Sequence, residues 1–158
     1  MKRVLAITTL VIFLAGCSRE IESDHEKVLS NEQWLDVAEE IMNEVDLPAL
    51  RFLSEEEINH LMGIETENIK SALVMVPMMK VYTTQILVFQ IEEAKIEVVK
   101  KAVDVYFEGY EKQWSSYLSD QHVLVENRLE KKIGNTLIVI VSDDVKTIES
   151  KIMAALNK

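Results

Sequence analysis

The sequence predicts an α+β fold, in which a four-stranded, mainly antiparallel sheet has helices packed on one face. Two observations predict this architecture. Short apolar runs, rich in β-branched residues, alternate with longer segments that have helical periodicity. The strands also come in two pairs, each followed by a helix, so the second half of the chain consists of two ββα units. Two N-terminal helices precede these units.

The length and composition suit one folded domain with an acidic surface. The 158 residues include 48% hydrophobic and 28% charged side chains, which is an ordinary globular composition. The formal net charge is −10, and a surface of this charge is repelled by nucleic acid and by anionic lipid head groups. We therefore expect no nucleic-acid partner.

Residues 1–17 have the features of a bacterial lipoprotein leader. Residues 1–3 are basic, and residues 4–15 form an apolar run that is too short for a transmembrane helix of roughly 20 residues. The run ends in Leu14-Ala15-Gly16-Cys17, which resembles a lipobox and contains the only cysteine of the chain. The resemblance implies cleavage before Cys17, a lipid on its thiol, and anchoring to the cell membrane on the side away from the cytoplasm. The alternative is an ordinary secretory leader with a chance cysteine.

These features divide the chain into a signal peptide at residues 1–16, a lipid-anchored tether at 17–30 and a single α+β domain at 31–158. The tether is polar, dense in charge and without periodicity. Its His25 has acidic neighbours, but a solvated imidazole explains the residue without a metal. Because the mature domain has no other cysteine, its core alone must stabilise it.

The two N-terminal helices have recognisable capping signals. Ser30 and Gln33 have the spacing of a capping box at the start of the first helix. Ser54 and Glu57 form a second box, and Gly63 ends the short helix that follows. The apolar face of the first helix is expected to contain Trp34, Ala38, Ile41 and Val45, widened by Leu35 and Met42.

The first ββα unit is predicted to have strands at residues 72–76 and 85–91 and a helix at 92–117, and the second to have strands at 122–133 and 137–141 and a helix at 145–156. The apolar runs at 86–89 and 137–141 should be central strands, with the other two strands outside them. Val139 should therefore be fully buried, and Thr136 exposed beside the Gly134-Asn135 turn. An ungapped offset of 51 residues aligns 72–105 with 123–156, which suggests an internal duplication.

The long predicted helix contains two stripes at helical spacing. The aliphatic stripe contains Ala94, Val98, Ala102 and Val105, and the aromatic stripe contains Tyr106, Tyr110, Trp114 and Tyr117. An exposed aromatic row could stack on a sugar or bind a peptide, so this stripe is the candidate ligand or partner surface. Aromatic residues at this spacing more commonly cover a sheet or another helix. Met75, Met78 and Met79 around Pro77 similarly indicate either an adaptable apolar surface or core filling.

No motif of a known catalytic or cofactor site is present, so we predict no catalytic residue, bound metal or cofactor. His60 follows Glu56 by four residues, and His122 lies near Asp120 and Glu126. Either group could be half of a metal site, whose remaining ligand would have to come from elsewhere in the fold. Hydrogen bonding at the surface is the alternative explanation for both histidines.

Several short segments occur in a recognisable order between Trp34 and the C-terminus. They are Met62-Gly63-Ile64, Val76-Pro77-Met78-Met79, Thr84-Gln85-Ile86-Leu87-Val88-Phe89, Gln113-Trp114 with Tyr117-Leu118, Val125-Glu126-Asn127, and Gly134-Asn135. In this order and spacing the chain resembles the domain of unknown function family 4358, small lipoproteins of Gram-positive bacteria. Thr136 stands where an aromatic residue would be expected. The resemblance implies a lipid-anchored domain outside the cytoplasm, but it brings no established activity and no site residue.

From these features we expect a membrane-anchored, extracytoplasmic and non-enzymatic module that binds a protein or peptide at the cell surface. The alternative is a cell-surface hydrolase that uses carboxylates or a metal ion. A concave pocket with Asp120, His122 or Glu126 pointing into it would favour the hydrolase, and a flat apolar strip would favour the binding module.

Overall fold

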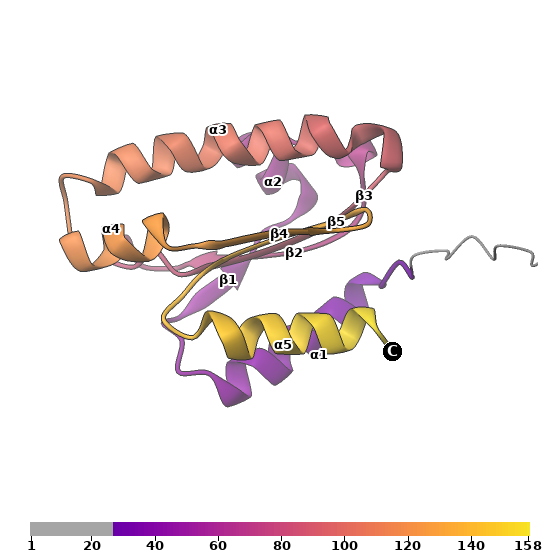
Figure 1. Ribbon diagram of the computed structural model, residues 1–158, viewed down its shortest axis with the longest axis horizontal. Helices are drawn as coiled ribbons and strands as arrows, with labels where there is room; N and C mark the ends of the chain where they lie inside the picture. Colours follow the sequence, from indigo (N-terminus) through magenta and orange to yellow (C-terminus); the bar gives the residue numbers. More distant parts are fainter. Residues whose placement is uncertain (1–26) are drawn as a thin grey trace, which may run out of the picture.

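The computed structural model describes residues 27–158, which form one sheet between two layers of helices (Figure 1). The proposed signal peptide, Cys17, His25 and most of the tether lie outside these residues. Every strand pair is antiparallel, so the predicted α+β class with an antiparallel sheet is confirmed. No helix within residues 27–158 has the length and apolarity needed to cross a membrane.

The sheet has five strands in the order β1-β2-β3-β5-β4. They are β1 (Leu50–Phe52), β2 (Ile69–Pro77), β3 (Gln85–Ile91), β4 (Leu129–Ile133) and β5 (Thr136–Val141). The apolar strands β3 and β5 are central, as predicted, and every residue in both is buried. The prediction of four strands is wrong because β1, with three residues, is too short to give a periodic signal. With β1 at the edge, β2 is not an outer strand along its whole length.

Helices cover both faces of the sheet, so the prediction that they pack on one face is wrong (Figure 1). One layer contains α2 (Glu55–Met62), α3 (Ile96–Trp114) and α4 (Ser119–Glu126), and the other contains α1 (Asn31–Glu44) and α5 (Val145–Leu156). Along β3, Leu87 and Phe89 contact the first layer, whereas Ile86 and Val88 contact the second. Strands that are apolar on both faces require cover on both, which explains the arrangement.

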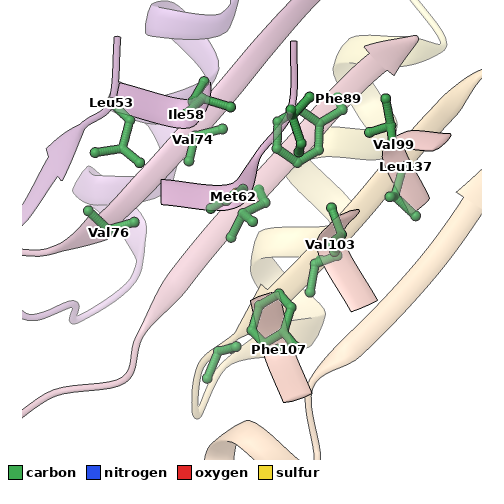
Figure 2. Close-up of a cluster of buried hydrophobic side chains, with 14 of the residues drawn as sticks. Leu53, Ile58, Met62, Val74, Val76, Phe89, Val99, Val103, Phe107 and Leu137 are labelled. Atoms are coloured by element: carbon green, nitrogen blue, oxygen red, sulfur yellow. The ribbon is translucent and has the colours of Figure 1, made fainter. Parts of the chain in front are cut away.

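The core beneath α2 and α3 is shown in Figure 2, where Leu53, Ile58 and Val74 lie at one end of the cluster. The buried face of α3 contains Ile96, Val99, Val103, Phe107 and Trp114. The predicted aliphatic stripe is therefore wrong, because Val98 and Val105 are 55% and 59% exposed. The true stripe begins at Ile96, after the 3-10 turn η2 (Glu93–Lys95), and lies on a different side of the helix.

The predicted strand at residues 122–133 is also wrong in its first half. Residues 119–126 form α4, which packs against α3, and β4 begins only at Leu129. The offset of 51 residues therefore aligns residues of β2 with a helix. Moreover, α3 and α5 cover opposite faces of the sheet, so the suggested duplication is not a structural repeat.

The predicted caps are confirmed. Both capping boxes are formed, and Gly63 and Gly134 have φ angles of 68° and 51°, which favour glycine. On α1, Leu35 and Met42 are exposed rather than part of the buried face. Thr136 is fully buried, against expectation, because β5 lies between two strands and Thr136 is opposite both Gln90 and Ile133.

Candidate functional site

The aromatic row on α3 does not form one exposed surface. Trp114 is buried, Tyr106 and Tyr110 are partly buried against the core, and only Tyr117 is open, with 63% of its surface exposed. The rings of Tyr106 and Tyr110 stack with centroids 5.6 Å apart, and Trp114 meets the edge of Tyr117 at 5.4 Å. Most of the aromatic surface is thus used to cover the sheet.

Burial keeps the two central tyrosines of this row protonated. Desolvation raises the pKa of Tyr106 and of Tyr110, and a hydrogen bond with Gln85 opposes the rise in both cases. The Tyr106 hydroxyl donates this bond to Gln85 Oε1 at 3.0 Å. At neutral pH these hydroxyls are hydrogen-bond donors inside the fold and have no tendency to act as general bases.

Exposed apolar side chains collect instead on the loop between β2 and β3. Met78 and Met79 are 62% and 56% exposed, and Val81 and Tyr82 are also open. We call these four residues, together with Tyr117, the distal apolar end. The loop is fixed to α4, because Thr83 donates hydrogen bonds to the Gln121 side chain and main chain at 2.9 to 3.2 Å. Tyr117 lies in the connection between α3 and α4, at the same end of the molecule (Figure 1).

The N-terminal segment joins the fold at the opposite end of β3. Gln90 Nε2 donates to the Lys27 carbonyl at 2.8 Å, and the Leu29 amide donates to Gln90 Oε1 at 2.7 Å. Leu29 is buried, so the last residues of the predicted tether are packed against the domain. The loop that carries the distal apolar end leads into Gln85, at the other end of the same strand.

Gln90 also belongs to a buried polar chain that reaches α1. Trp34 Nε1 donates to Ser71 Oγ at 3.1 Å, and Ser71 Oγ donates to Gln90 Oε1 at 2.9 Å. All three side chains are buried, and the chain of bonds satisfies polar groups that would otherwise be costly in the interior. It also fixes the position of α1 and of the N-terminal segment on β2 and β3.

A groove of about 210 Å³ lies beside this chain, along the side of β2 that β1 leaves uncovered. We call it the edge groove. Its walls come from α1, through Trp34 and Leu35, and from the start of α2, through Ser54 and Glu55. Sequence analysis missed this groove, because it depends on where β1 ends and on two helices that lie on opposite faces.

A second cluster contains possible metal ligands. One ligand atom each from Glu111, His122 and Glu126 lies within 4.8 Å of the other two, beside an open hollow between α3 and α4. Glu111 is the third group that the sequence could not identify, since it lies on α3. However, Glu111 is 3.4 Å from Arg128, and His122 is 3.6 Å from Glu126, so the three groups already have ionic or hydrogen-bonding partners. Asp120 is exposed and outside the cluster, as are Glu56 and His60 on α2.

The chain was compared with known families, curated proteins and solved structures. Residues 43–157 match the family described as Domain of unknown function (DUF4358). No curated protein and no solved structure matches the chain.

Proposed function

Because the chain belongs to the family described as Domain of unknown function (DUF4358), we propose its function from its own residues: it is a lipid-anchored, extracytoplasmic binding module. The anchoring part of the proposal rests on the basic start, the short apolar run and the lipobox-like segment that ends at Cys17. The binding part rests on the surface of the folded domain.

The observation that carries the binding function is the distal apolar end. Two adjacent methionines, a valine and a tyrosine are exposed on one loop, although the interior has ample apolar residues for its core. Contiguous apolar surface is uncommon on monomers and is typical of protein interaction sites, where methionine and tyrosine are enriched. Methionine also adapts its shape to different partners. We therefore propose a protein partner.

The position of this surface relative to the anchor supports the same conclusion. The N-terminal segment is held at Gln90, and the loop begins beyond Gln85, so five residue steps of β3 separate them. At about 3.4 Å a step this is roughly 17 Å. A lipid on Cys17 would hold the Gln90 end toward the membrane, and the distal apolar end would face away from it.

A second candidate function, hydrolysis at a bound metal ion, is favoured by the cluster of Glu111, His122 and Glu126. One imidazole and two carboxylates are a reasonable ligand set for Zn²⁺ and would leave coordination positions open. Binding would have to replace the pairing of Glu111 with Arg128. Calorimetric titration with Zn²⁺ tests this candidate: a site that disappears in His122→Ala supports it, and no heat of binding removes it.

Site-specific photocrosslinking in intact cells tests the binding module. A benzophenone amino acid at Tyr82 should give an adduct of discrete mass, which Met79→Glu should abolish by placing a charge in the contact. Val105 is the matched control position, because it is equally open but lies on the solvent face of α3. An equal adduct from position 105, or no adduct from positions 78, 82 and 117, would contradict the proposal.

A further inference from the structure

The edge of β2 beside the edge groove has free positions for another strand. β1 pairs only with residues 75–77 of β2, and the Leu53 amide then donates to the Val74 carbonyl at 2.9 Å. Beyond this bond the chain turns into α2, so residues 69–73 have no strand on that side within the described part of the chain. Main-chain groups of alternate residues point to the same side of a strand. Because Val74 points toward β1, the N–H and C=O of Ala72 point into the edge groove.

We propose that the edge groove binds an extended, basic peptide segment of another protein, which adds to the sheet as a short strand beside Ala72. An open strand edge recognises an extended backbone through its main-chain groups, and flanking pockets recognise alternate side chains. The groove, at about 210 Å³, is smaller than the roughly 300–1,000 Å³ of small-molecule sites. It suits one or two side chains of a peptide better than a complete small ligand.

The shape of the groove favours a single strand over a second copy of this chain. Residues of α1 form one wall and residues of α2 form the other, so the slot is closed on both faces of the sheet. A strand that carried its own covering helices would collide with these walls. The shift in register between Ile69 and Ser71 ends the regular ladder and limits the added strand to a few residues.

Charge distinguishes the possible occupants in the same direction. Glu55 is in the wall of the groove, Glu56 follows it, and the whole chain has a net charge of −10. A second copy would therefore be repelled. The chain's own residues 20–26 are also unsuitable, because four of the seven are acidic. A segment that alternates basic and apolar residues complements both the charge and the apolar lining. This site is separate from the distal apolar end, so either proposal can fail without the other.

The main test uses peptide probes and the full mature chain in phosphatidylcholine nanodiscs, which carry no net charge that would attract the probes. A fluorescent, end-blocked peptide that alternates lysine and valine should bind with a saturable change in polarisation. Methylating every second amide should weaken binding about tenfold or more in one phase, and little in the other, because only one set of amides faces β2. Equal affinity of the two methylated peptides, or no binding of the parent, would overturn the proposal.

Variants of the protein locate the site. Ala72→Pro removes only an outward N–H, which an edge strand tolerates, and should lower affinity about tenfold or more. Lys132→Pro is the matched control on the opposite edge: Ile133 pairs with Thr136 across the two-residue turn, so the Lys132 amide points outward. It should leave affinity unchanged, as should Met79→Glu. If Ala72→Pro does not fold, the methylated pair still decides.

Two further outcomes would overturn the proposal. If Ala72→Pro abolished self-association of the chain rather than peptide binding, the occupant would be a second copy. If a peptide that alternates glutamate and valine bound as well as the basic one, the charge argument would be wrong and the peptide class would have to be abandoned.

Discussion

The burial of valine residues provides a direct test of the fold, through one substitution made at two positions. Val139 lies in the middle of β5 and is fully buried, with its side chain in the core cluster beneath α3. Val105 lies on α3 and is 59% exposed, although its spacing with Val98 suggested a buried stripe. Val139→Asp and Val105→Asp therefore introduce the same carboxyl group into two very different environments.

The expected cost at Val139 follows from its burial. Loss of a fully buried valine side chain removes about 1.5–3 kcal/mol of hydrophobic free energy. A buried polar group without a hydrogen-bond partner costs a further 2–7 kcal/mol or so. The sum is comparable to the whole unfolding free energy of a typical domain, about 5–15 kcal/mol. At Val105 the change is at the surface, where substitutions usually alter stability by about 0.5 kcal/mol or less.

Urea and thermal unfolding, followed by circular dichroism, would measure both effects. We expect Val139→Asp to be unfolded or nearly so, and Val105→Asp to melt within a few degrees of the wild type. Val139→Ala, which should cost about 2 kcal/mol, provides a measurable intermediate if the aspartate variant cannot be purified. Equal destabilisation at both positions, or a larger loss at Val105, would refute the assignment of the buried face of α3 and the central place of β5.

Three other predictions concern the anchor, metals and pH. Cys17→Ser should abolish incorporation of a fatty-acid analogue in cells, and equal labelling of wild type and variant would refute lipidation. Excess EDTA should leave the melting temperature of the purified protein unchanged, because the core needs no metal; a large drop would contradict this. Burial raises the pKa of Tyr106 above its unfolded value of about 10, so the folded state holds this proton more tightly. Stability should therefore fall as the pH rises above about 10, and less steeply in Tyr106→Phe, as urea unfolding at the two pH values would show.

The sequence predicted those features that depend on neighbouring residues. Both capping boxes, the turn at Gly134 and the two central strands are local patterns, and all are present. It did not predict which face each helix covers. The runs in β3 and β5 are apolar at every position, so they indicate burial on both faces and carry no alternation that would assign a helix to one side. That information was present in the runs but was not used.

The errors in α3 and α4 have a different origin. Val98 and Val105 have the same helical spacing as a buried stripe, and only the position of the sheet decides against them. The residues of α4 include two β-branched valines and form a weakly amphipathic segment, so packing against α3 determines that they are helical. The edge groove and the grouping of Glu111 with His122 likewise arise from contacts between distant segments, which no local pattern records.

The two buried glutamines of β3 connect the separate surfaces of the molecule. Gln90 holds the N-terminal segment and, through Ser71 and Trp34, supports one wall of the edge groove. Gln85, at the other end of the strand, accepts a hydrogen bond from Tyr106 beside the loop of the distal apolar end. If Cys17 carries a lipid, the nine residues 18–26 span at most about 30 Å from the membrane to the first described residue. The edge groove would then lie on the side of the domain nearer the membrane and meet segments close to the bilayer. The distal apolar end would meet proteins farther out, so the two proposed surfaces are placed to bind different partners.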